Sequence, residues 1–139
     1  MQEDGRATNA AIAKRAGISP AACHTRLRRL FADGHIKRVK AVLDPDKLDR
    51  GVAAVIGVIL DRSTDQSFAE FEAAVADLPL VQDCQLVAGE FDYFLKVRLR
   101  DMAEANRFLT KNIIGLPGLR QIRTFFVIKD VKSDGDLVF

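Results

Sequence analysis

Few residues of this chain have the types and spacing that covalent or metal chemistry requires. The only two histidines are His24 and His35, and neither lies beside a nucleophile or an acid in a recognised catalytic arrangement. Cys23 directly precedes His24, so on a helix the two side chains would point about 100° apart, a poor start for a shared metal. A glycine loop of the kind that cradles phosphates is missing as well. We therefore expect no enzyme, no metal site and no cofactor.

Charge, by contrast, is distributed unevenly along the chain. Residues 1–40 contain nine Lys or Arg against three acids, a net charge of +6, whereas the rest of the chain carries a net charge of −4. A basic end on an acidic protein favours a polyanionic partner such as nucleic acid. The plain alternative is a basic helix face that is merely solvated, and charge alone does not decide between the two.

Two short helices must position these basic residues. The first is predicted over residues 8–16, opened by a capping Thr8 or Asn9 and stopped by Gly17. The second is predicted over residues 20–32, because Ser19 is a serine cap and Pro20 is a proline at the first helical position. The three residues between them are the spacing of a helix-turn-helix.

The start of the second helix is the candidate DNA-reading surface. Its short side chains would let the helix end approach a duplex, and its free N–H groups and dipole favour phosphate. Residues 35–40 then alternate basic and apolar side chains, as expected of a strand or wing along the DNA backbone. The candidate contacts with double-stranded DNA are Ser19, Pro20, Ala21, Ala22, Thr25, Arg26, Arg28, Arg29, Lys37 and Arg38.

The remaining chain alternates strand and helix patterns. Proline and acids indicate a linker over residues 43–50, which separates expected domains at 1–42 and 51–139. The predicted order is a strand at 53–60, a helix at 67–78 capped by Ser67, strands at 81–88 and 93–99, a helix capped by Asp101 with an apolar stripe of Met102, Ala105, Phe108 or Leu109, and Ile113, and a strand at 122–131. This β-α-β-β-α-β order is typical of the ferredoxin-like fold, so the expected class is α+β.

The predicted strands are apolar on both faces, although two helices can cover only one face of the sheet. We expect the second face to pack on another subunit.

No segment of the sequence indicates a membrane span or a signal peptide. The longest apolar run, Val52–Leu60, is far too short to cross a bilayer, and the first four residues are polar and acidic. We therefore expect a cytoplasmic protein without a membrane partner, in which Cys23 and Cys84 are reduced thiols.

Short stretches in both parts of the chain occur in an order and spacing that are highly specific together. They are Asp4-Gly5-Arg6, residues 12–20, residues 26–30, residues 33–36, Gly89-Glu90-Phe91-Asp92-Tyr93, Leu116-Pro117-Gly118 and Arg123-Thr124. Over nearly its whole length the chain thereby resembles the Lrp/AsnC (feast/famine) transcription regulators. The resemblance implies a winged helix-turn-helix, then a ferredoxin-like domain that pairs through its sheets, with dimers assembling into tetramers, octamers or larger particles.

The resemblance also implies an amino acid, or a related small molecule, as an effector at the junction between dimers that shifts assembly and DNA affinity. Glycine N–H groups could hold its carboxylate, Asp92 could accept from its ammonium, and Phe125 could provide an apolar wall. The plain alternatives are that Asp92 stabilises its own turn and that Tyr93 belongs to the core. The effector residues so implied are Leu86, Gly89, Asp92, Tyr93, Met102, Thr124 and Phe125.

One departure from the family concerns the start of the chain. Members carry another helix before the Asp-Gly-Arg loop, and this sequence begins at Met1 without it. A misassigned start, a truncation and a weakened DNA-binding half are the open explanations. The expected function is a sequence-specific, effector-responsive transcription regulator; the alternative is an oligomeric metabolite-sensing module with little or no DNA binding.

Overall fold

A computed structural model describes residues 1–133 and 135–138 of the chain. The structure divides into two compact units. One comprises Met1–Leu43 and the described residues after Val131, and the other comprises Asp44–Val131. No helix among the described residues is long and apolar enough to cross a membrane.

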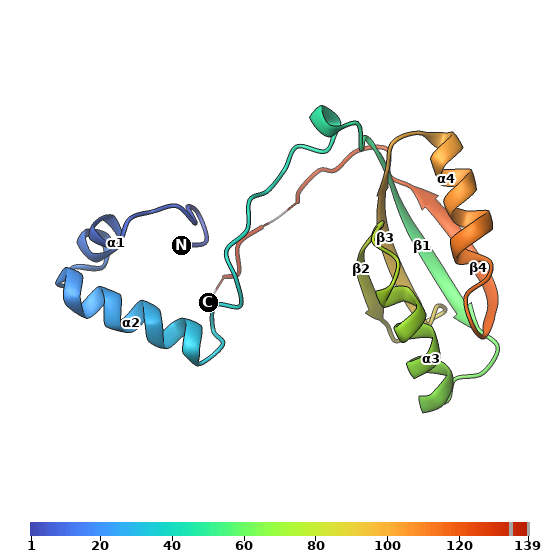
Figure 1. Ribbon diagram of the computed structural model, residues 1–139, viewed down its shortest axis with the longest axis horizontal. Coiled ribbons are helices and arrows are strands. Elements are labelled where there is room, and N and C mark those ends of the chain that lie inside the picture. The colour runs from blue at the N-terminus through green and yellow to red at the C-terminus, as the bar shows by residue number, and fades with distance from the viewer. Residues whose placement is uncertain (134, 139) are drawn as a thin grey trace. The chain divides into compact units, whose positions relative to one another are not determined.

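The N-terminal unit is built on two helices, α1 (Asn9–Ala16) and α2 (Pro20–Ala32) (Figure 1). The hydroxyl oxygens of Thr8 and Ser19 each accept a hydrogen bond of 3.2 Å from an N–H of the first turn, as predicted for helix caps. Gly17 follows α1 with a φ of 65°, a conformation that side chains disfavour. The predicted helix-turn-helix is confirmed.

Small buried side chains hold the two helices together. Ala13 of α1 and Cys23 of α2 are 1% and 2% exposed. The Asn9 side-chain amide donates to the Pro20 carbonyl oxygen at 2.8 Å, which ties the first turn of α1 to the first turn of α2. The C-terminal tail also joins this unit, because the Gln2 side chain donates to the Leu137 carbonyl at 3.1 Å and accepts from the Leu137 N–H at 3.0 Å.

The strand expected over residues 35–40 is not formed. Ile36 donates its N–H to the Leu30 carbonyl at 3.0 Å, and the backbone then continues without regular secondary structure. A strand needs a neighbouring strand to share its ladder of hydrogen bonds, and alternation of side chains alone does not supply one.

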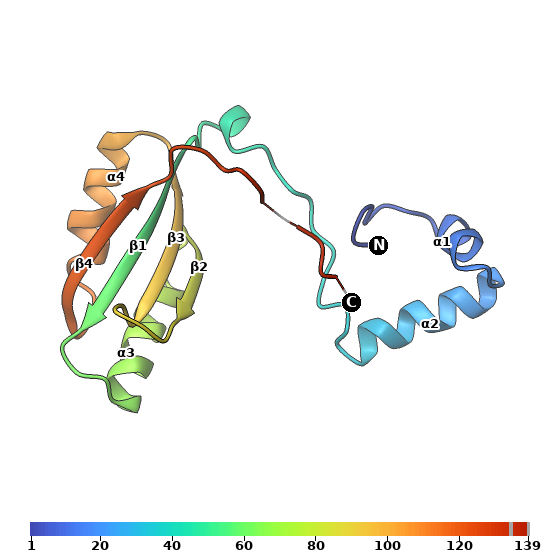
Figure 2. The same ribbon diagram turned by 180° about the vertical axis from the view of Figure 1, so that it is seen from behind.

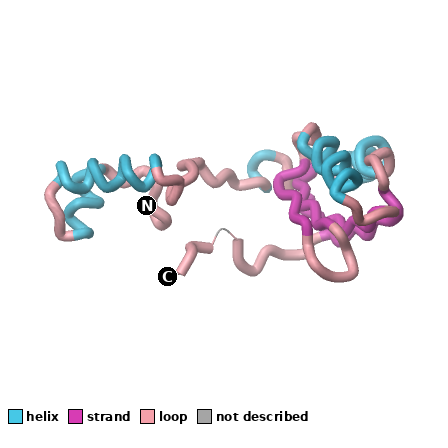
Figure 3. Tube along the Cα trace, turned by 90° about the horizontal axis from the view of Figure 1, so that it is seen from below, coloured by secondary structure: helices cyan, strands magenta, loops and turns pink. Residues whose placement is uncertain are grey.

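The second unit is a four-stranded antiparallel sheet with two helices on one face, as Figures 1 and 3 show. The strands are β1 (Val52–Leu60), β2 (Val81–Leu86), β3 (Tyr93–Leu99) and β4 (Leu119–Phe126), in the spatial order β2-β3-β1-β4, which Figure 2 shows from behind. The helices are α3 (Asp65–Ala76) and α4 (Met102–Phe108), which continues into a π-helical turn at Leu109–Ile113, and a 3₁₀ turn at Asp46–Leu48 precedes β1. The ferredoxin-like α+β fold is confirmed.

The core lies between the helices and the sheet. On β3 the predicted alternation is confirmed, since Tyr93, Leu95, Val97 and Leu99 are at most 1% exposed. The inward side chains of β1 and of the helices complete this core, the largest of them being Ile56, Val58, Phe71, Phe108 and Ile113.

Several predicted details of this unit are wrong, since α3 ends at Ala76, β2 ends at Leu86 and β4 begins at Leu119. The helix expected at Ser67 begins at Asp65, because Thr64 is its cap and Ser67 closes a capping box from the third helical position. Met102 is 57% exposed, so it does not belong to the buried stripe of α4. The last strand ends at Phe126 instead of Val131, since its register with β1 ends at the Ala54–Phe126 pair, after which the Val127 N–H donates to the Ala53 carbonyl.

Candidate functional site

The candidate DNA contacts form an exposed surface on α2 and the segment after it. Nine of the ten predicted residues are exposed, and Ala22 is half-buried behind them. Ser19 and Thr25 spend part of their hydrogen-bonding capacity on the helix itself, because Thr25 donates to the Ala21 carbonyl at 3.2 Å. Among the candidate contacts, the side chains that remain free to reach a polyanion are Arg26, Arg28, Lys37 and Arg38.

The basic charge of this unit is only partly neutralised. Arg15 pairs with Glu3 at 3.1 Å, and Arg29 pairs with Asp33 at 3.4 Å, one turn further along α2. The other Lys and Arg side chains of residues 1–40 form no ion pair with another described residue, so their charge faces solvent.

In the second unit, the turn between β2 and β3 is fixed by Asp92. One carboxylate oxygen of Asp92 accepts from the Leu60 N–H at 2.7 Å, and the other accepts from the Ser63 hydroxyl at 3.5 Å. The Asp92 N–H donates to the Val58 carbonyl at 2.8 Å. Within residues 1–133 and 135–138, the N–H groups of residues 89–91 have no hydrogen-bond partner, so the turn presents free donors.

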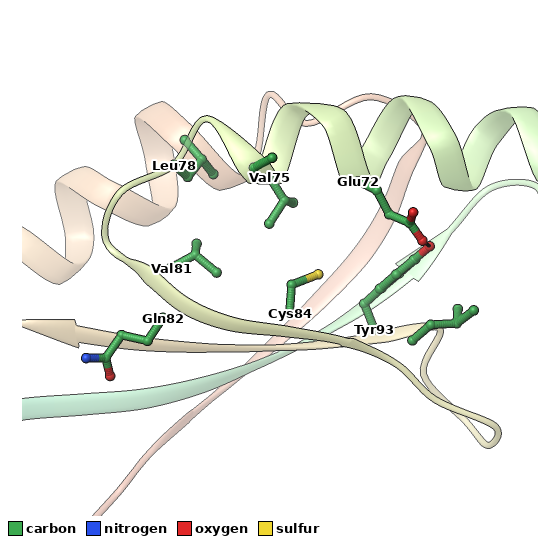
Figure 4. Close-up of a pocket in the computed structure, with 9 residues that line it drawn as sticks. Glu72, Val75, Leu78, Val81, Gln82, Cys84 and Tyr93 are labelled. Atoms are coloured by element: carbon green, nitrogen blue, oxygen red, sulfur yellow. Dashed lines mark hydrogen bonds between the residues drawn. The ribbon is translucent and has the colours of Figure 1, made fainter. Parts of the chain in front are cut away.

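Tyr93, the next residue, points to the opposite side of the sheet into the core. Its hydroxyl donates to a carboxylate oxygen of Glu72 at 2.7 Å, and Figure 4 shows the two side chains meeting between α3 and β3. Phe68 and Phe71 pack on its ring, with centroids at 5.9 and 4.7 Å. Burial, and then the bond to Glu72, raise the pKa of Tyr93 well above the ordinary tyrosine value.

A groove of about 370 Å³ lies beside this pair, between α3 and the edge strand β2 (Figure 4). Apolar side chains form much of its wall, and Glu72, Cys84 and Tyr93 add polar atoms. Burial raises the pKa of the Cys84 thiol and the Glu72 carboxylate raises it further, which favours the neutral thiol. Cys23 and Cys84 are both free, in agreement with the predicted reduced state.

On the other face of the sheet, which no helix of the unit covers, Phe91 lies over Gly57. A Cβ atom at Gly57 would come within 2.7 Å of two Phe91 ring atoms, so only glycine leaves room for the ring. Phe94 and Phe125 flank the Phe91 ring with centroid distances of 5.3 and 6.3 Å. We call Phe91, Phe94 and Phe125 the aromatic cluster.

The predicted effector residues do not share one cavity within a single chain. Leu86 and Tyr93 line the groove, Asp92 is tied back to β1, and Phe125 belongs to the aromatic cluster on the opposite face. Thr124 is half-buried and stands opposite Ile56 in the register of β4 with β1, which places it on the helix-covered face. Met102 follows the far end of β3, about 20 Å from the turn at the usual rise of a strand.

Two residues at this end of the sheet, Gly57 and Glu72, were not predicted as part of the site, and Phe91 was expected only as a member of the turn of residues 89–93. A glycine inside an otherwise apolar strand signals close approach of another group, and that signal was available at Gly57. The contacts of Glu72 and Phe91 depend on which elements become neighbours, which the local sequence pattern does not indicate. No group of three His, Cys, Asp or Glu side chains suited to a metal occurs in the described part of the chain.

Comparisons with known proteins agree with both units. Residues 1–30 match the model of the AsnC-type helix-turn-helix domain, and residues 53–137 match that of the Lrp/AsnC ligand binding domain. The leucine-responsive regulatory proteins of Salmonella typhimurium and Escherichia coli are 39% and 38% identical over 138 residues, which is 99% of this chain and 84% of each relative.

Solved structures give the same result. A transcriptional regulator of Neisseria meningitidis in complex with L-Met superimposes with a TM-score of 0.89 at 31% identity, covering 95% of this chain and 85% of that one. The AsnC family regulator of Agrobacterium tumefaciens gives 0.91 at 27% identity, covering 99% and 89%. The feast or famine regulatory protein of M. tuberculosis complexed with L-methionine gives 0.85 at 28% identity, covering 98% and 90%.

A basic helix-turn-helix unit joined to a ferredoxin-like ligand-binding unit defines a class of DNA-binding transcription regulators. The chain belongs to the Lrp/AsnC family of that class. Its relatives are oligomeric regulators and not enzymes, which confirms the predicted function and does not support the predicted alternative of a sensing module with little or no DNA binding.

Proposed function

We propose that this regulator reads DNA with the first turns of α2 and that Lys37 and Arg38 contact the phosphate backbone. The proposal is supported by the exposure of α2 and by the unpaired cations around it. The free N–H groups at the start of α2 would face phosphate, and the arginines further along would anchor the register. The proposal includes a cytoplasmic location, because the DNA partner is there. It also keeps the expected domain limits at residues 42 and 51.

Fluorescence anisotropy across a series of salt concentrations tests DNA recognition. The probes are a duplex from the region upstream of the regulator's own gene and a scrambled duplex of equal length. We expect the first to bind about 10³-fold more tightly, the lower end of the range for specific sites. Equal affinity for both duplexes at every salt concentration would refute sequence-specific reading by this surface.

The proposed effector is an amino acid with an apolar side chain, captured at the turn of residues 89–92. The N–H groups of residues 89–91 support this assignment, because they have no hydrogen-bond partner among the described residues and backbone N–H groups can bind a carboxylate. Asp92 keeps unused lone pairs on its carboxylate, so it can accept from the effector ammonium as well as from Leu60. The methionine complexes of the Neisseria and Mycobacterium proteins favour L-methionine as the first compound to test.

The effector site is completed by a second copy of the chain. Met102 and the turn lie at opposite ends of β3, so they can enclose one ligand only if they come from different copies. The uncovered face of the sheet supplies the pairing surface, and paired chains then assemble into tetramers, octamers or larger particles.

Asp92→Asn tests the ligand contact without removing the turn. The amide oxygen of asparagine can still accept from the Leu60 N–H, whereas the charge that attracts an ammonium is lost. We expect L-methionine to bind about tenfold more weakly, the size of one charge-assisted hydrogen bond. Isothermal titration calorimetry provides the measurement, and D-methionine is the control ligand. Unchanged affinity in the variant would show that Asp92 serves only its own turn.

A further inference from the structure

The aromatic cluster connects the effector turn to the uncovered face of the sheet. Phe91 belongs to the turn itself, Phe94 to β3 and Phe125 to β4, so the three rings span the sheet across β1. The ring of Phe91 occupies the space that Gly57 leaves free in the middle of β1. The Phe91 side chain thus holds the turn on the sheet by packing against the backbone of β1 at Gly57.

Arg123 of β4 also contacts Phe91 on the uncovered face of the sheet. Its guanidinium carbon lies 5.8 Å from the centroid of the Phe91 ring, within the range of a cation–π contact. It also pairs with the Glu90 carboxylate at 3.2 Å. Two consecutive residues of the turn are therefore bound to β4 on this face.

The turn is anchored on both faces of the sheet, and the two anchors differ in kind. On the helix-covered face, Tyr93 is held by its hydrogen bond to Glu72, and at the end of β1 the Asp92 carboxylate accepts from the Leu60 N–H. On the uncovered face, Phe91 is held by packing and by Arg123 alone. Because the N–H groups of residues 89–91 are unpaired, a ligand that binds them acts on the Phe91 backbone directly.

The surface around the cluster is apolar and open. Phe125 is 49% exposed, and the half-buried Val55 of β1 stands opposite it in the register of the two strands. This is the surface to which we assign pairing with a second copy, so a shift of the Phe91 ring changes the shape that the partner meets.

We propose that Phe91 is a positioning residue that couples effector capture at the turn to pairing of the uncovered sheet faces. The inference rests on the proposed function, because it assumes that the turn binds the effector. When a ligand binds the N–H groups of the turn, the Phe91 ring shifts in the space that Gly57 leaves free. The side chains of Phe125 and Arg123, which contact this ring, shift with it. Coupling of this kind is reciprocal, so pairing must alter effector affinity by the factor by which the effector alters pairing.

The test measures this reciprocity in the full-length protein with L-methionine as the probe. Tyr93 is the only tyrosine and the chain has no tryptophan, so intrinsic fluorescence reports on the residue next to the turn. L-methionine is titrated at one protein concentration below the midpoint of self-association and at one above it. Sedimentation velocity with and without L-methionine gives the assembly state. For the wild type we expect effector affinities that differ at least about fivefold between the two concentrations, the lower end of typical coupling.

Two substitutions remove the coupling by different routes. Phe91→Ala deletes the ring, whereas Gly57→Ala keeps every ring of the cluster but adds a methyl group where Phe91 must sit. Whatever the absolute affinity of each variant for L-methionine, it should be the same at both protein concentrations. Phe91→Leu should restore part of the difference, because it returns an apolar side chain to the seat, and it also serves if Phe91→Ala folds poorly.

Phe126→Ala is the matched control. Phe126 neighbours Phe125 in β4 and is 42% exposed, but its register position opposite Ala54 lies on the helix-covered face. It should retain the wild-type difference in effector affinity.

The outcomes separate the two proposals. If the wild type does not bind L-methionine or any other apolar amino acid, the proposed effector function fails and the coupling role fails with it. If the wild type shows the concentration dependence and both Phe91→Leu and Gly57→Ala retain all of it, the coupling role of Phe91 is refuted while the effector function stands.

Discussion

Asp92 and Tyr93 are adjacent residues whose polar groups serve different sides of the sheet. Asp92 joins the turn to the end of β1, and Tyr93 joins it to α3 through Glu72. The sequence showed that both residues follow a turn glycine, but it did not show which partners they would take. The plain alternative that Tyr93 belongs to the core is correct, since Tyr93 is only 1% exposed.

Tyr93 should ionise at an unusually high pH. Burial disfavours the charged tyrosinate. The Glu72 carboxylate accepts a hydrogen bond from the neutral hydroxyl and would repel the tyrosinate, so the folded-state pKa of Tyr93 is raised. The stability that this contact contributes is present below the ordinary tyrosine pKa and is lost as pH rises through the folded value. Ultraviolet titration of the single tyrosine measures this directly. Glu72→Gln should lower the midpoint, and Glu70→Gln, on the same helix, should not. A wild-type midpoint at the ordinary tyrosine value would contradict the buried hydrogen bond.

At the scale of the elements, most helix and strand positions were predictable because local rules fix them. Serine before proline and glycine after a helical run mark ends that tertiary contacts rarely move, and Tyr93–Leu99 shows its buried face by strict alternation. Boundaries that depend on a neighbour were not predictable. Residues 35–40 carry a strand-like pattern without a pairing partner, and β4 ends at Phe126, where its register with β1 ends at Ala54.

The structure begins α3 at a different residue from the one that the sequence pattern predicts. The Thr64 hydroxyl oxygen accepts from the Ser67 N–H at 3.2 Å. In return, the Thr64 N–H donates to the Ser67 hydroxyl oxygen at 3.0 Å. Thr64→Ala should therefore lower the free energy of unfolding of the ligand-binding unit by about 1 kcal/mol, whereas Thr64→Ser should be nearly neutral. Urea denaturation followed by circular dichroism provides the measurement. If Thr64→Ala were neutral, the helix would begin at Ser67 as its spacing alone indicates.

At the scale of the whole molecule, charge is separated between the two ends of the chain. The net charge of +6 on residues 1–40 coincides with the unit that carries the helix-turn-helix, whereas the rest of the chain has a net charge of −4, which disfavours contact with a polyanion.

Arg28→Ala should reduce the salt dependence of DNA binding. Each phosphate contact releases counterions, so losing one changes the slope of log K against log salt by about 1. The same loss should weaken binding to specific and scrambled duplexes alike, because a phosphate contact carries no sequence information. Arg107→Ala, which removes an equally exposed arginine from α4, is the control and should leave the slope unchanged. An unaltered slope in Arg28→Ala would exclude Arg28 from the phosphate contacts.

The C-terminal tail makes the ligand-binding unit an insertion within the DNA-binding unit. The chain leaves the first unit at Leu43 and rejoins it after Val131, where Leu137 meets Gln2. If Asp44–Val131 unfolds, the tail contact must be closed across one long flexible loop, and loop closure costs entropy that grows with the logarithm of its length. An effector that stabilises the inserted unit therefore also favours the closed tail. Ligand binding can in this way order the DNA-binding unit through chain entropy alone, without any movement passing from one unit to the other.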